Sequence, residues 1–263
     1  MAALRTLGEL GQDYPDRRQT LANEICGYLR LPSADDRSET QVREVAQDVL
    51  RDHLRPYRSK DGTPQNNNFW PNTEINLQGA HLVDANFAYC EFGRANFDET
   101  NFEGTTWFRG STFASEARFV GSIFDGWLVS FEDAVFEHYA WHRWTAFNAC
   151  AEFQGARFKF NAEFSRARFS QGVDFSRISV DNVGWFTHNV FDGTTLFRDA
   201  KFSSAQFIQV LFRGPVDFRG TKFVNGADRQ EVFITDDPEI AEACHWPSGW
   251  LSHKEPSSSS DEN

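Results

Sequence analysis

Only a few residues in this sequence have the types and spacing that metal or redox chemistry requires. His138 and His142 lie four residues apart, a spacing that could place two imidazole ligands on one helix face, but no third ligand accompanies them. The cysteines at positions 26, 90, 150 and 244 form no Cys-x-x-Cys pair and join no histidine in a zinc pattern. We therefore expect no bound metal or cofactor, and free, mostly buried thiols of the kind found in a reducing cytoplasm.

Acid–base and nucleophilic chemistry also lack a sequence signature. The paired carboxylates at 98–99 and 132–133 are neighbours along the chain, and nothing around them would separate their pKa values. The sequence contains no Gly-x-Ser-x-Gly, no glycine-rich phosphate loop before a helix and no His-Glu-x-x-His. We therefore interpret these carboxylates as surface groups, and expect no catalytic residues and no enzyme activity.

Phenylalanine repeats along most of the chain, and this repeat must position the other side chains of that region. Phenylalanine recurs every five or six residues from Phe87 to Phe223; 24 of the 27 phenylalanines fall on this register, and Trp141 and Val180 fill two of its gaps. A helix would repeat at 3.6 residues and a half-buried strand at two, so neither accounts for this spacing. The spacing suits a chain that turns a corner after each repeat and points one large side chain at a central axis.

The repeats also carry a recognisable motif. Residues 84–87, 94–97 and 155–158 read Asp-Ala-Asn-Phe, Arg-Ala-Asn-Phe and Gly-Ala-Arg-Phe. Over residues 74–226 the sequence therefore resembles the pentapeptide-repeat family, with its pattern Ala-(Asp/Asn)-(Leu/Phe)-x-x. The resemblance implies a mainly β fold, a right-handed quadrilateral β-helix of about seven coils. From Phe153 onward the spacing alternates between five and six, which predicts coils of 22 residues with Glu152 stacked over Asp174 and Arg157 over Ser179.

The segments on either side of the repeats differ from them in composition. Apolar residues at helical spacing predict an N-terminal helical unit over residues 1–58. We expect residues 227–253 to cap the other end of the coil, and the Ser- and acid-rich residues 254–263 to be a disordered tail. Leu7, Leu10, Asp13 and Pro15 contribute to a resemblance between the helical unit and actinobacterial pentapeptide-repeat proteins in which two membrane-spanning helices come first. That resemblance implies the cytosolic arm of a membrane-anchored protein, if an upstream anchor is missing from this sequence.

The net charge of −12 is concentrated outside the repeats. Residues 74–226 hold 18 acids and 14 bases, whereas residues 227–263 hold nine acids and two bases. No basic patch suited to nucleic acid is visible. The resemblance also implies an alternative function as a DNA mimic, because one branch of the family binds type II topoisomerases such as gyrase. That role requires a strongly acidic rod, which this near-balance of charge does not provide.

Three tryptophans are candidates for an interaction surface. Trp107 precedes a central phenylalanine and should point outward, Trp127 follows about one coil later where the spacing stretches to seven, and Trp144 is close in sequence. Exposed tryptophans gathered on one side of a rod would form a protein-binding surface. The alternative is that Trp127 covers a bulge and Trp144 packs on a corner. We therefore predict a non-catalytic protein-interaction or scaffold module, with a gyrase binder or a membrane-anchored arm as alternatives. The sequence identifies neither the protein partner nor the oligomeric state.

Overall fold

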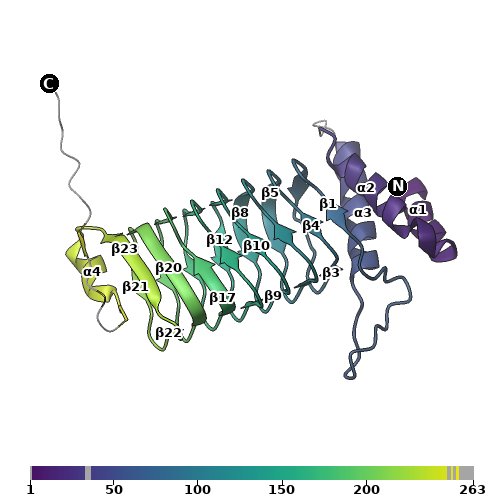
Figure 1. Ribbon diagram of the computed structural model, residues 1–263. Helices are drawn as coiled ribbons and strands as arrows, with labels where there is room; N and C mark the ends of the chain where they lie inside the picture. Colours follow the sequence, from purple (N-terminus) through teal and green to yellow (C-terminus); the bar gives the residue numbers. More distant parts are fainter. Residues whose placement is uncertain (1, 33–36, 248–249, 251–252, 255–263) are drawn as a thin grey trace.

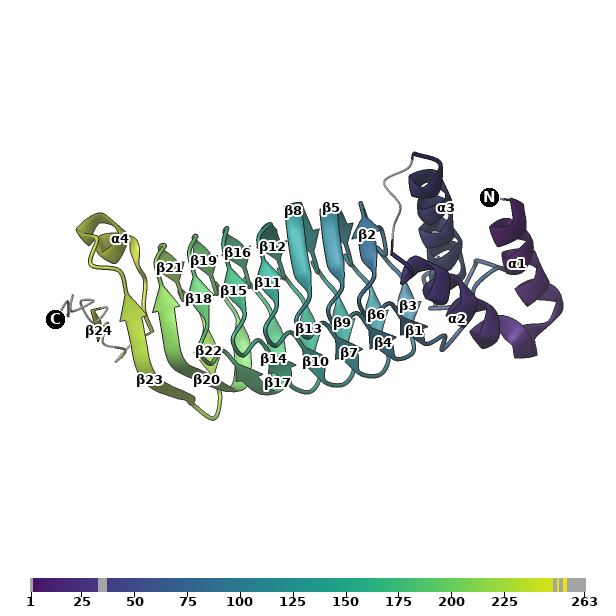
Figure 2. The same ribbon diagram turned by 90° about the horizontal axis from the view of Figure 1, so that it is seen from above.

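The computed structural model describes residues 2–32, 37–247, 250 and 253–254 of the chain (Figure 1). The N-terminal helices gather at one end of a long rod of short strands, and the described C-terminal segment, with its one short helix, lies at the other end (Figure 2). Apart from Lys254, the predicted disordered tail lies outside the described residues.

The N-terminal helices are α1 Ala2–Asp13, the 3-10 helix η1 Pro15–Arg17, α2 Arg18–Leu29 and α3 Arg37–Leu54. Pro15 occupies the first position of η1, where its missing N–H forfeits no helical hydrogen bond. α2 and α3 each bury one apolar stripe whose members recur at helical spacing: Leu21, Ile25 and Leu29 in α2, and Ala46, Leu50 and Leu54 in α3. The short helix α4 Pro238–Ala243 follows the rod.

The rod is built from parallel strands that are mostly two residues long. The strands are β1 Ile75–Asn76, β2 His81–Val83, β3 Glu91–Phe92, β4 Ala95–Asn96, β5 Asn101–Trp107, β6 Thr112–Phe113, β7 Ala117–Arg118, β8 Ile123–Ser130, β9 Val135–Phe136, β10 Ala140–Trp141, β11 Ala146–Phe147, β12 Cys150–Glu152, β13 Arg157–Phe158, β14 Ala162–Glu163, β15 Arg168–Phe169, β16 Val173–Asp174, β17 Ser179–Trp185, β18 Val190–Phe191, β19 Thr195–Leu196, β20 Lys201–Phe212, β21 Val216–Asp217, β22 Lys222–Phe223, β23 Ala227–Ile234 and β24 His253–Lys254. Most pair with the strand one coil further on, for example β1 with β4 and β4 with β7. The result is the predicted β-solenoid of about seven coils.

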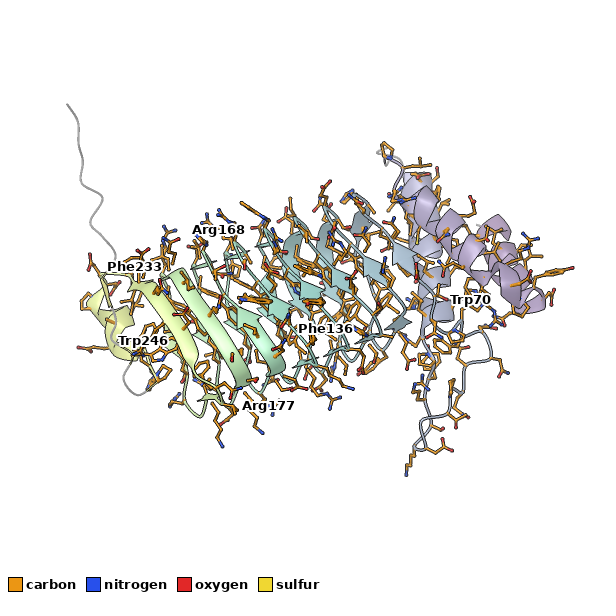
Figure 3. All side chains as sticks on the ribbon, in the orientation of Figure 1. Trp70, Phe136, Arg168, Arg177, Phe233 and Trp246 are labelled. Atoms are coloured by element: carbon orange, nitrogen blue, oxygen red, sulfur yellow. The ribbon has the colours of Figure 1, made fainter. Side chains whose placement is uncertain are left out.

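Inward-facing side chains form four columns along the axis, one for each side of the coil, and we number the outer faces in the same way. Column 1 holds Leu77, Phe97, Phe119, His142, Phe164, Phe186 and Phe207; column 2 holds Leu82, Phe102, Phe124, Phe147, Phe169, Phe191 and Phe212. Column 3 holds Phe87, Phe108, Phe131, Phe153, Phe175, Phe197 and Phe218; column 4 holds Phe92, Phe113, Phe136, Phe158, Val180, Phe202 and Phe223. Rings within a column stack face to face at the strand spacing, as Phe136 does on Phe113 at 4.7 Å and on Phe158 at 4.6 Å. Phe136 is labelled in Figure 3.

The strand register confirms the predicted 22-residue coil. Glu152 pairs with Asp174, and Arg157 pairs with Ser179. The assignment of Trp141 to the central register was wrong, because His142 fills that position and Trp141 lies one residue before it on the outer face. Spacings of five and six are equally regular in this coil, so counting from Phe136 could not choose between the two residues.

Both ends of the coil stack are covered by neighbouring segments. At the first coil, α3 side chains donate to strand-edge carbonyls: Arg43 to His81 O at 3.2 Å and Gln47 to Val83 O at 3.3 Å. At the last coil, the rings of Trp246 and Trp250 lie 5.9 and 5.1 Å from the ring of Phe218. These contacts satisfy or hide groups that an open β-solenoid end would expose to edge-to-edge pairing.

Candidate interaction surface

The three candidate tryptophans do not share one face. Trp107 lies on face 3 and is half-buried, directly before Phe108 of column 3. Trp127 lies at the corner between faces 2 and 3, where its side chain is 84% exposed. Trp144 lies at the corner between faces 1 and 2 and is 54% exposed. Trp127 and Trp144 therefore lie at opposite edges of face 2, and Trp107 lies around the corner from it.

Trp127 is presented by a β-bulge at the point where the phenylalanine spacing stretches to seven. β5 and β8 pair as far as Gly104 with Gly126 and resume at Thr105 with Leu128, which leaves Trp127 without a partner residue. Glycine is required at the crossing, because a Cβ on Gly126 would lie 2.1 Å from the backbone oxygen of Gly104. The close approach of the two glycine backbones therefore fixes where the indole leaves the rod.

Trp144 is fixed by a different contact. Its φ of 60° lies in the left-handed region that this coil uses at its corners. The guanidinium carbon of Arg166, one coil further on, lies 4.6 Å from the centre of the Trp144 ring, a cation–π contact. The indole is therefore held in place while half of its surface stays open to solvent.

Two further apolar side chains lie on face 2 between the corners that carry the exposed tryptophans. Ile123 of β8 pairs in register with Ala146 of β11, and Ile123 is 42% exposed. Ala146 is half-buried on the same face. We call Ile123, Trp127, Trp144 and Ala146 the face 2 patch. A run of exposed apolar groups on two neighbouring coils is the type of surface that protein partners cover.

A second aromatic group, which sequence reasoning missed, lies on face 1. The ring of Tyr139 stacks at 5.3 Å on Trp141 and meets Phe160 edge-on at 4.7 Å. In the register of the rod, Glu163 lies between Trp141 and Trp185. The signal that could have placed Trp141 outside was Ala140, because a small buried residue stands two positions before many central residues.

Glu163 is the most perturbed carboxylate in this aromatic group. Burial raises the pKa of Glu163, and the Arg143 guanidinium at 3.4 Å and a hydrogen bond from Ser165 oppose that rise. The carboxylate is already paired with a cation. The Glu163–Arg143 ion pair therefore contributes to the packing of face 1, and it does not provide a separate general acid and general base.

The two candidate histidine ligands lie in different environments. His138 is exposed, whereas His142 is fully buried between Phe119 and Phe164, at ring-centre distances of 4.9 and 4.8 Å. Neither ring nitrogen of His142 has a hydrogen-bond partner, and burial lowers its pKa to about 3. Within the described part of the chain, no three His, Cys, Asp or Glu side chains are arranged to hold a metal ion.

The cysteines are free, but they differ in burial. Cys26 and Cys90 are buried, Cys244 is half-buried and Cys150 is exposed. Burial raises the pKa of the Cys26 thiol to about 11 and that of Cys90 to about 12, so both stay protonated at neutral pH. The expectation of mostly buried thiols therefore holds for two of the four.

Among the described residues, eight of the 18 acidic side chains between positions 74 and 226 form ion pairs with arginine or lysine. Asp98 accepts from Arg118 at 2.6 Å, and Asp192 lies 2.8 Å from Arg168. Burial alone would raise the pKa of Asp217, but hydrogen bonds from Arg219 and Arg198 outweigh it and hold that pKa well below its usual range. The pairs neutralise much of the rod's negative charge where it is displayed.

The geometry defines a repeat protein whose solenoid interior is filled by side chains. A sequence model of pentapeptide repeats in nine copies matches residues 73–112 and 97–141, and the same coils continue to Phe223. The coils of residues 73–141 are therefore pentapeptide repeats. No curated protein matches its sequence significantly. Among the described residues, no helix combines the length and apolar character needed to cross a membrane.

Proposed function

We propose that this pentapeptide-repeat protein is a non-catalytic protein-interaction module and that the face 2 patch is its contact surface, with Trp107 at the flank. The carrying observation is the exposure of Trp127, whose indole is 84% open to solvent on a bulge fixed by two glycines. A tryptophan side chain has only two rotatable bonds and so loses little conformational freedom on binding, and tryptophan is among the residues that dominate interface energies.

The test is partner capture with the intact chain and a variant of the patch. The double substitution Trp127→Ala and Trp144→Ala removes both exposed indoles, and Tyr89→Ala is the matched control. Tyr89 is an exposed aromatic residue at a positive-φ corner, as Trp144 is, but it lies between faces 3 and 4. We expect partners captured from the source cells to be lost with the double variant and kept with Tyr89→Ala. Equal capture by all three proteins would refute the assignment of this surface.

The alternative of gyrase binding has less support, because residues 74–226 carry 14 bases beside their 18 acids, and several of those acids are paired with arginine. A DNA mimic needs unpaired negative charge in a regular array. If excess protein inhibited gyrase supercoiling, this ranking would be reversed. A cytoplasmic location is supported by the free state of all four cysteines.

A further inference from the structure

A polar pocket of about 470 Å³ lies where the helical segment meets the rod. One wall is a single face of α2 that carries Asn23 and Arg30, and α2 lies beside β1 at the start of the solenoid (Figure 2). The opposite wall is face 1 of the first two coils, which contributes Asn76, Arg94 and Asn96. Asn76 and Asn96 are direct neighbours in the strand register.

The asparagine oxygens on both walls are already used as acceptors. Asn76 Oδ1 accepts from the backbone N–H of Gln78 at 3.2 Å, and Asn96 Oδ1 accepts from that of Asp98 at 3.0 Å. A backbone N–H can only donate, so these two bonds fix the orientation of both amides. In each case the Nδ2 group, with its two hydrogens, is left for another acceptor.

The orientation of Asn23 follows by the same logic through Gln19. Gln19 Oε1 accepts from the backbone N–H of Glu74 at 2.9 Å, so its Nε2 must be the donor. That Nε2 donates to Asn23 Oδ1 at 2.9 Å, which fixes this oxygen as an acceptor too. Among the described residues, no hydrogen-bond acceptor is seen for the Nδ2 groups of Asn23, Asn76 and Asn96.

Two guanidinium groups add positive charge to these donors. Arg30 forms no ion pair with the described residues, and Arg94 lies 3.9 Å from Glu116, the outer limit of an ion pair. The lining contains one carboxylate, that of the exposed residue Glu74. The pocket is therefore net positive and rich in donors, although the whole chain has a net charge of −12.

We propose that this pocket binds a small organic anion through a phosphate or carboxylate group. Such oxygens accept from guanidinium and amide N–H groups, and charge-assisted bonds of this kind are among the stronger ones. The volume lies in the range of pockets that hold small organic ligands. Because the two walls come from α2 and from the coils, the bound anion bridges the helical segment and the rod.

The test is calorimetric titration of the full chain with inorganic phosphate, glycerol 3-phosphate and succinate at constant ionic strength, with glycerol as the neutral comparison. We expect saturable binding of at least one anion and none of glycerol. Arg30→Gln should weaken that binding about tenfold or more, because it removes a charge-assisted donor. Asn96→Asp keeps the acceptor for Asp98 N–H but replaces the donor amide with a carboxylate, and should abolish binding.

The matched control is Asn86→Asp. Asn86 Oδ1 accepts from the backbone N–H of Ala88 at 3.2 Å, the same local turn as at Asn96, but Asn86 lies on face 3 outside this pocket. Binding should be unchanged in this variant, and thermal unfolding checks that each variant is folded. The proposal is overturned if none of the three anions binds saturably, or if Arg30→Gln and Asn96→Asp bind as tightly as Asn86→Asp does.

Discussion

Replacing His142 by phenylalanine should stabilise the rod, and the gain should grow as the pH falls. His142 interrupts a column of phenylalanine rings, with Phe119 and Phe164 stacked on its two sides. The rings that meet it edge-on, Phe131, Phe136 and Phe153, are also apolar. Phenylalanine would make the same stacking contacts and would remove two ring nitrogens that have no hydrogen-bond partner.

The gain at neutral pH comes from those nitrogens. An unsatisfied buried polar group costs about 1–3 kcal/mol, so we expect His142→Phe to raise the free energy of unfolding by about that amount at pH 7. Strain from fitting the larger six-membered ring between Phe119 and Phe164 would reduce this gain in stability. The direction is set by desolvation, because the site contains no acceptor or donor that the substitution would strand.

The additional gain at lower pH comes from protonation of the unfolded chain. The pKa of His142 is about 3 in the folded protein, compared with 6.5 for a histidine in the unfolded chain. Between these values the unfolded chain binds a proton that the folded chain does not, so the wild-type free energy of unfolding falls as pH decreases below 6.5. The slope is about 1.4 kcal/mol per pH unit, which gives about 3 kcal/mol by pH 4.

The assay is guanidinium unfolding of both proteins at pH 7, 6, 5 and 4. Carboxylates titrate in both proteins and cancel in the difference, which should be about 1–3 kcal/mol at pH 7 and should rise steadily below pH 6.5. Parallel pH profiles for the two proteins would refute the reasoning, because they would mean that His142 is not held neutral in the core.

Three further substitutions test the architecture, each with a matched control. Phe136→Ala should lower the free energy of unfolding by about 3–5 kcal/mol, whereas Phe160→Ala, at a residue that is 37% exposed, should have a much smaller effect in the same denaturant assay. Gly126→Ala should cost about 1–3 kcal/mol, since its Cβ would meet Gly104 O at 2.1 Å, whereas Gly172→Ala, with its nearest atom at 3.4 Å, should be nearly neutral in thermal unfolding. Arg43→Ala should strand the carbonyl of His81 and increase self-association in sedimentation velocity; an unchanged monomer fraction and stability would contradict the capping role of α3.

The sequence by itself determined the solenoid and most of its register. One large ring at every fifth or sixth residue can be buried only if each turn of the chain stacks on the next, and this requirement also placed Glu152 over Asp174. The register was misread at Trp141, because spacing alone cannot separate adjacent residues in a coil that accepts both five and six. Ala140 carried the missing information, since the position two before a central residue is buried and most often holds a small side chain.

The tertiary structure alone decided which outer residues lie together. Trp127 and Trp144 border the same face because a bulge and a corner fall on neighbouring coils, which depends on pairing between strands far apart in sequence. The pocket of Asn23, Asn76 and Asn96 depends on how α2 docks on the first coils. The apolar stripe of α2 predicts that one face of this helix is buried. It does not predict which side of the solenoid that face packs against, because the hydrophobic effect is not directional.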